Sequence, residues 1–166
     1  MSYPSLTNAY VIDHDGGGLK RFQCMPETIS DSKGSTYGTY DILGRSSPLM
    51  GYQSGPARTV EFTAVFFAAP TQGNDSPTPA DLEETKNWFL GLPYPDYSKG
   101  LMPPHRCTVF VGQSVKLRGI CSYASAVMQG TSPWDLGPGF VHHIAIALKF
   151  EECLDTPLGV TERRAG

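Results

Sequence analysis

Long segments in which apolar and polar side chains alternate are the feature that most limits how this chain can fold. Residues 58–67 place four apolar side chains on one face: Val60, Phe62, Ala64 and Phe66. Residues 140–153 repeat the pattern with Ile144, Ile146, Leu148 and Phe150. A period of two is typical of a strand with one buried face. These segments therefore predict a β-sheet packed on an apolar core.

Shorter strands and a single helix complete the expected order. Further strands are predicted at 9–13, 19–24, 107–111 and 114–127. A helix is predicted over 80–91, because Thr78 can cap its start and Pro79 suits its first turn. Strands do not alternate with helices, which argues against a parallel doubly wound sheet. The expected fold is mainly β: an antiparallel β-sandwich or small barrel with one flanking helix.

Charge, cysteines and hydropathy exclude several classes of function. The 166 residues carry a net charge of −3 without a Lys/Arg cluster, which argues against binding of a phosphate backbone. Four cysteines occur without a CxxC motif, and we expect them to be buried, reduced thiols rather than metal ligands: Cys24, Cys107, Cys121 and Cys153. No apolar stretch is long enough to cross a bilayer, and the first residues do not resemble a signal peptide. We expect a protein that is made in a cytoplasm.

The reactive side chains do not form a recognisable catalytic or metal motif. Asp13, His14 and Asp15 precede a glycine-rich turn, which favours a surface-turn role. Ser46 and Ser47 lack a GxSxG elbow. We therefore predict a protein that is not an enzyme, with no cofactor and no metal. Two alternatives remain: a monomeric β-barrel that binds a small ligand, and a small hydrolase using these serines or a metal at His14.

Residues 40–56, YDILGRSSPLMGYQSGP, combine aromatic, arginine and serine side chains in a segment broken by glycine and proline. Such a segment suits an active-site loop or a docking arm that meets another copy of the chain. The missing catalytic partners favour the arm, for which we take residues 25–56, with 25–40 irregular or weakly extended. Arg45 would make two-pronged bonds to a neighbour; the alternative is that it caps a local turn. Trp134 would either pack under its own loop or contact a neighbouring subunit.

A series of short motifs in order along the chain resembles a known family. Residues 22–67 follow the pattern F-x-x-x-P-E, a polar stretch with aromatics, G-R-S-x-P, and a strand that begins with arginine. A helix, PPHRCTVFVG, VKLRGICS, a Trp-containing loop and ALKFEE follow. Together they resemble the N-terminal module of baseplate proteins of phages and contractile injection systems, the tail-tube-initiator-like family, some of which carry a lysine-motif (LysM) domain. We do not expect such a domain here, since residues 154–166 alone follow the last predicted strand.

The resemblance implies a tail-tube-like fold of two roughly orthogonal antiparallel sheets, and assembly into a ring, commonly of six copies. We expect a single domain over 1–153 with a polar tail over 154–166. The expected role is a structural virion protein at the junction of tail tube and baseplate, or a component of a phage-derived injection system. Its partners would be further copies of itself, the tail tube protein and other baseplate or hub proteins, with DNA as passing cargo and no membrane. The predicted interface residues are Tyr37, Tyr40, Gly44, Arg45, Ser46, Pro48, Tyr52, Arg58 and Trp134.

Overall fold

A seven-stranded antiparallel sheet forms the body of the protein. The computed structural model describes residues 8–68, 78–97, 100, 102–128 and 143–153. The strand order in the sheet is β2-β1-β9-β10-β11-β6-β3, and every neighbouring pair is antiparallel. The strands are β1 (Ala9–Asp13), β2 (Gly18–Arg21), β3 (Ile29–Ser32), β6 (Thr59–Phe67), β9 (Arg106–Val111), β10 (Val115–Met128) and β11 (His143–Glu152).

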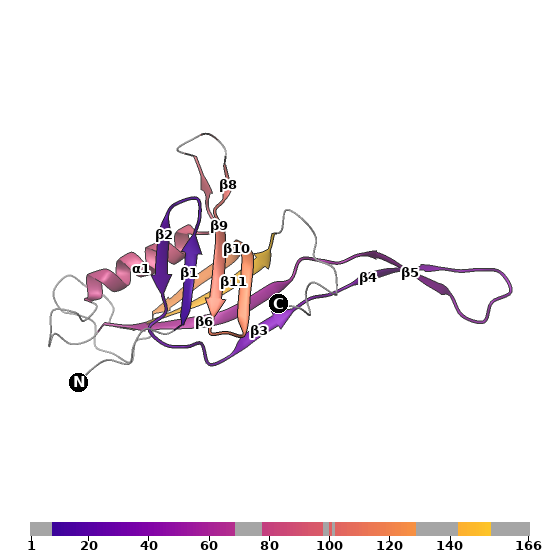
Figure 1. Ribbon diagram of the computed structural model, residues 1–166, viewed down its shortest axis with the longest axis horizontal. Coiled ribbons are helices and arrows are strands. Elements are labelled where there is room, and N and C mark those ends of the chain that lie inside the picture. The colour runs from indigo at the N-terminus through magenta and orange to yellow at the C-terminus, as the bar shows by residue number, and fades with distance from the viewer. Residues whose placement is uncertain (1–7, 69–77, 98–99, 101, 129–142, 154–166) are drawn as a thin grey trace.

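Strand β10 belongs to both halves of this sheet. Its first part, 115–120, pairs with β9, and its second part, 119–128, pairs with β11. The register shifts between Cys121 and Tyr123, as in a bulge, which bends a strand and increases its twist. The sheet consequently folds over itself: β1, β2 and β9 run across the direction of β6 and β11 (Figure 1). This is how sandwich corners are made when one strand contributes to two sheets.

The expectation of a mainly β, antiparallel, sandwich-like fold with one helix is confirmed, but a closed barrel is not formed. Within the described residues, β2 and β3 each pair along one side only, so the sheet has two edges. The predicted strands at 58–67, 107–111, 114–127 and 140–153 correspond to β6, β9, β10 and β11.

The apolar faces of the two halves meet in one core. Phe62 and Phe150 stack with ring centroids 6.0 Å apart, and Val60 and Ile146 are fully buried beside them. The predicted faces of β6 and β11 are the ones that are buried. Burial of such side chains supplies the main driving force for the fold.

The helix α1 (Pro79–Gly91) closes the core at one side. Its start is fixed by a capping box, in which the Thr78 hydroxyl accepts from the backbone N–H of Asp81 and the Asp81 carboxylate accepts from that of Thr78. The hydrogen bonds that the Asp81 carboxylate accepts from the backbone N–H and the hydroxyl of Thr78 lower the pKa of Asp81. Phe89 is fully buried and lies 5.8 Å from Phe22 and 5.7 Å from Phe66, measured between ring centroids.

Two ribbons of paired strands leave this body. The longer is formed by β4 (Thr36–Tyr40) and β5 (Leu49–Ser54), and the shorter by β7 (Pro95–Asp96) and β8 (Met102–Pro104). The interpretation of residues 25–40 as irregular or weakly extended was incomplete, because β3 and β4 lie within them. In a ribbon with both faces in water, no buried face separates apolar from polar positions, so its sequence lacks the alternation by which strands are recognised.

Candidate interaction surface

Residues 33–57 form an arm that projects from the end of the sheet where β3 finishes and β6 begins (Figure 1). Along the arm, β4 pairs with β5 from Thr36 opposite Ser54 to Tyr40 opposite Leu49. Within this segment only Gly38 and Gly51 are half-buried, and all the other residues are exposed. The sequence placed an arm at 25–56; in the structure, β3 pairs with β6 in the main sheet instead of belonging to the projection.

The arm carries large apolar side chains that are not covered by the described part of the chain. They are Tyr37, Tyr40, Ile42, Leu43, Leu49, Met50 and Tyr52. Leu43, at the tip, is 105% exposed. Tyr37 and Tyr52 contact each other across the two strands, edge to face, at 5.9 Å between centroids. An isolated two-stranded ribbon is marginally stable in water, and an exposed apolar patch commonly marks a binding surface.

The tip of the arm presents Arg45 to solvent. Gly44 adopts a positive φ of 87°, which glycine tolerates without steric cost, and the backbone N–H of Arg45 donates to the carbonyl of Ile42 at 3.1 Å. The local turn is thus closed by the backbone. The Arg45 guanidinium has no hydrogen bond or ion pair within residues 8–68 or the other described ranges. Ser46 and Pro48 lie beside it and are exposed.

Arg58, predicted as an interface residue, is instead buried at the base of the arm. Only 4% of it is exposed. Its Nε donates to Asp31 at 2.7 Å, a second guanidinium nitrogen pairs with the same carboxylate, and Nη1 donates to the carbonyl of Lys116 at 3.2 Å. The Asp31 carboxylate raises the pKa of Arg58, against the opposing effect of burial. Arg58 therefore ties the start of β6 to β3 and β10. The direct contact with a neighbouring subunit that the sequence predicted for Arg58 is corrected, because its guanidinium is buried.

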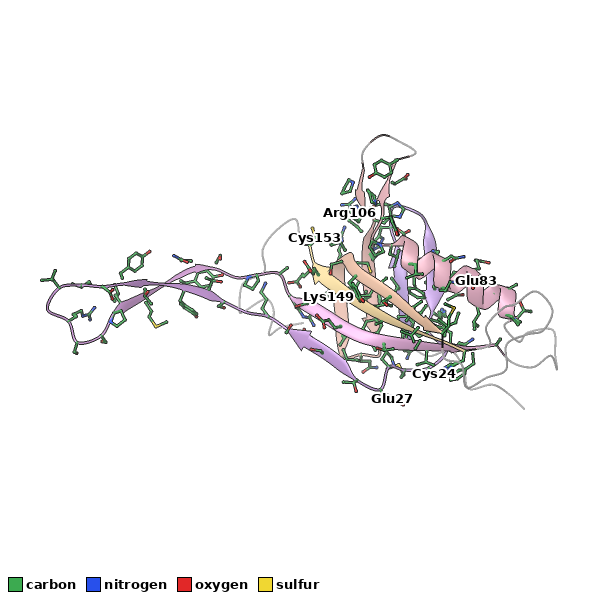
Figure 2. The ribbon with its side chains drawn as sticks, turned by 180° about the vertical axis from the view of Figure 1, so that it is seen from behind. Cys24, Glu27, Glu83, Arg106, Lys149 and Cys153 are labelled. Carbon is green, nitrogen blue, oxygen red and sulfur yellow. The ribbon has the colours of Figure 1, made fainter. Side chains whose placement is uncertain are left out.

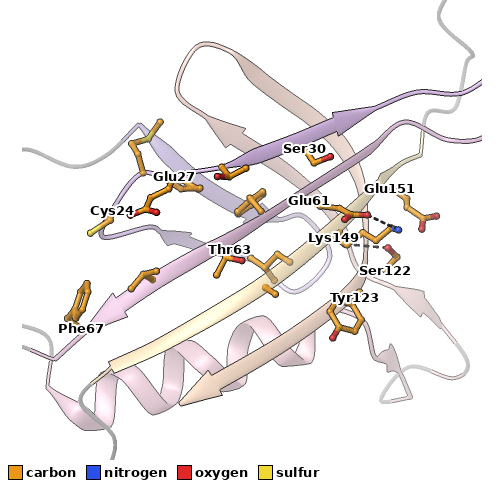
Figure 3. A pocket seen from close by; sticks show the side chains of 17 residues that line it. Cys24, Glu27, Ser30, Glu61, Thr63, Phe67, Ser122, Tyr123, Lys149 and Glu151 are labelled. Carbon is orange, nitrogen blue, oxygen red and sulfur yellow. Dashed lines mark hydrogen bonds and ion pairs between the residues drawn. The ribbon is translucent and has the colours of Figure 1, made fainter. Parts of the chain in front are cut away.

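An open groove lies along the outer face of the sheet beside β6 (Figure 3). Its volume is about 1060 Å³. Its floor is formed by apolar and small side chains of two neighbouring strands, among them Val65 and Phe67 of β6 and Ala147 of β11. Cys24 and Glu27 lie at one end. At the other end Lys149 bonds Glu61 at 2.8 Å, and this pairing raises the pKa of Lys149. The groove cannot be recognised in the sequence, because its lining comes from four separate segments that only the folded sheet brings together.

The Asp13–Asp15 cluster joins β1 to β9. Asp13 is 6% exposed, and its carboxylate accepts from the backbone N–H groups of Asp15 and Gly16 and bonds His105 Nδ1 at 2.8 Å. His14 Nε2 lies 2.7 Å from Thr108 Oγ1. The two backbone hydrogen bonds close the turn itself, and the contacts with His105 and Thr108 fasten it to β9 and the residue before it. Within the described residues, no group of three or more His, Cys, Asp or Glu side chains could hold a metal ion.

The cysteines divide into two pairs. Cys107 and Cys121 are buried, and burial raises the pKa of each thiol to about 12. Cys24 and Cys153 are exposed, so the expectation of burial was wrong for these two. They lie at well-separated places on the body (Figure 2).

The remaining predicted site residues are placed as follows. Ser46 and Ser47 lie at the exposed arm tip, and neither bonds a histidine within the described residues. Trp134 lies outside the described residues. In the part of the chain that the structure describes, no helix is both long and apolar enough to traverse a bilayer.

Comparison with known proteins adds little. No protein-family model matches the chain, and no curated protein matches it. Among solved structures, it is similar to a chain from the tail of an empty GTA particle with C6 symmetry. The identity is 10%, the TM-score is 0.41, and the match covers 91% of this chain and 96% of that chain. A likeness at this TM-score supports no conclusion about function.

Proposed function

We propose that the chain is a structural subunit of a phage-tail-like particle, and that copies assemble head to tail into a ring through the arm. The observation that carries the proposal is the arm itself: a ribbon of exposed tyrosines and aliphatic side chains that the described part of its own chain does not cover. Ordering such a segment costs conformational entropy, which burial against a neighbour would offset.

We take the contact to be heterologous rather than two-fold. The arm leaves one end of the sheet (Figure 1), so an arm that docks on the body of the next copy joins two different surfaces. A contact between two different surfaces generates a ring when the rotation closes. The exposed edges β2 and β3 would gain cover in such a ring, which would reduce unwanted pairing with other strands.

The order of short motifs in the sequence supplies the biological setting of the proposal. On this basis the ring, commonly of six copies, would surround the tail channel at the junction of tube and baseplate, with the tail tube protein and other baseplate proteins as partners. The net charge of −3 is acceptable for a lining past which DNA moves. The protein would be made in the host cytoplasm and carried in the virion or in a phage-derived injection device. The proposal assigns it no catalysis.

Replacing Arg45 tests the proposal at the arm tip. Because its guanidinium bonds nothing in the described part of its own chain, we expect Arg45→Ala to leave the urea unfolding midpoint unchanged while the assembled fraction falls severalfold. Multi-angle light scattering over a concentration series, with electron microscopy of the assembled particles, measures the second quantity.

Arg58→Ala is the matched control. It removes a buried guanidinium that bonds both the Asp31 carboxylate and the Lys116 carbonyl at the arm base, so we expect the free energy of unfolding of the monomer to fall by about 2 kcal/mol. Wild-type protein that stays monomeric at every concentration would contradict the proposal, as would undiminished assembly of Arg45→Ala.

A further inference from the structure

We infer that the groove along β6 receives the arm tip of a second copy of this chain. This rests on the proposed function, and it names the surface that the arm contacts. Both partners are apolar surfaces left uncovered within the described residues: the tip exposes Ile42 and Leu43, and the groove exposes Met25 and Phe67.

Charge complementarity between the two surfaces selects a second copy as the occupant. The groove is lined by Glu27, Glu61, Glu151 and Lys149, three carboxylates against one ammonium, for a net charge of −2. The arm, residues 33–57, carries Lys33, Asp41 and Arg45, two cations against one carboxylate, for a net charge of +1. Opposite charge steers two surfaces together and fixes their register.

Glu27 is the best placed partner for Arg45. Glu61 already pairs with Lys149 at 2.8 Å. Glu27 is exposed at the other end of the groove, beside Cys24, and has no ion pair within the described residues (Figure 3). A guanidinium and a carboxylate that lose water on docking form a bidentate pair with defined geometry.

The tip of a molecule cannot occupy the groove of the same molecule. The arm departs where Thr59 begins β6 and points away from the body (Figure 1), whereas Cys24 and Phe67 mark the far end of the groove. Nine residues of strand separate these ends by about 30 Å. The contact therefore joins two copies.

A native thiol makes the contact directly testable. Cys24 lines the groove and is exposed, while Cys107 and Cys121 are buried. We therefore design Leu43→Cys in a Cys153→Ser background, in which Cys24 is the one accessible native thiol among the four. A disulfide needs Cα atoms within about 7 Å of each other, so bonding between Cys24 and the new thiol reports the tip in the groove.

Mild oxidation of the assembled full-length variant should give a ladder of covalent oligomers on a non-reducing gel. Adding Cys24→Ser should abolish the ladder. Any covalent product that remains should be a dimer in which the introduced thiols of two copies bond each other. Ser54→Cys in the same Cys153→Ser background is the matched control, because it places the thiol at the arm base, and its ladder should be at least about tenfold weaker.

Charge reversal provides a second readout that does not depend on thiols. We expect Arg45→Glu and Glu27→Arg each to weaken assembly at least about tenfold, and the double variant to recover most of that loss. Glu84→Arg is the matched control: it lies on α1, pairs with Lys20 and is not part of the groove, so assembly should not change.

The outcomes separate this inference from the proposed function. Assembly that depends on the arm but shows no Cys24-dependent ladder and no effect of Glu27→Arg would overturn the groove as the receiving surface and leave the ring proposal standing. A wild-type protein that remains monomeric would overturn both.

Discussion

At the residue scale, Gly119 lies at the point where the two halves of the sheet join. It pairs with Cys107 of β9 on one side and with Glu152 of β11 on the other. A Cβ atom at this position would lie 1.9 Å from the carbonyl oxygen of Glu151 and 2.7 Å from its carbon. Both atoms are backbone, so neither can move aside cheaply. The close approach of β11 to β10 requires the absence of a side chain here.

Gly119→Ala should consequently destabilise the monomer by about 3 kcal/mol or more, measured by urea unfolding. Gly91→Ala is the matched control, because a Cβ there meets no atom within 4 Å and the residue ends α1. That change should shift stability by no more than about 1 kcal/mol, in the stabilising direction. Equal effects of the two substitutions would contradict the close packing described for β10 and β11.

At the scale of elements, the arm and the central strands should differ sharply in local stability. The hydrogen bonds of β4 and β5 join only each other, in water, whereas β10 and β11 lie inside the sheet and cover buried side chains. Opening a solvent-exposed ribbon costs little free energy, and opening a core strand approaches the cost of global unfolding.

Hydrogen exchange read by mass spectrometry should therefore show fast exchange over 36–54 in dilute monomer and slow exchange over 143–152. On assembly the arm amides should become protected by at least about tenfold, while the β11 amides, already slow, serve as the internal reference. An arm that is as protected in the monomer as β11 would mean that it is already covered by its own chain.

At the scale of the whole molecule, the thiols report which surfaces are open. Cys24 and Cys153 are exposed, and the buried Cys107 and Cys121 have pKa values raised to about 12. A thiolate is the reacting species, and at pH 8 a group with that pKa is ionised only about once in ten thousand molecules.

A thiol-reactive chromogenic disulfide should modify two cysteines of the native monomer at once and the other two only after unfolding. In the assembled protein Cys24 should be shielded and Cys153 should remain reactive, which Cys24→Ser and Cys153→Ser identify separately. Four thiols reacting together in native protein would contradict the described core.

The sequence alone determined the elements whose signals are local. The alternation in β6 and β11 follows from one buried face, and the start of α1 follows from the capping residues Thr78 and Pro79. It also favoured an arm over an active-site loop for the glycine- and proline-broken segment near Arg45, because the partners of a catalytic site were missing from the sequence.

Only the tertiary structure decided how distant segments meet. Arg58 reads as a surface residue until β3 brings Asp31 to it and β10 brings the Lys116 carbonyl. The pairing of β4 with β5 leaves no alternation of apolar and polar residues in the sequence, because both faces are exposed. The groove exists only once β6, β10 and β11 lie side by side. Local patterns record which face of an element is buried; which partner buries it depends on packing across the whole chain, which no short stretch of sequence contains.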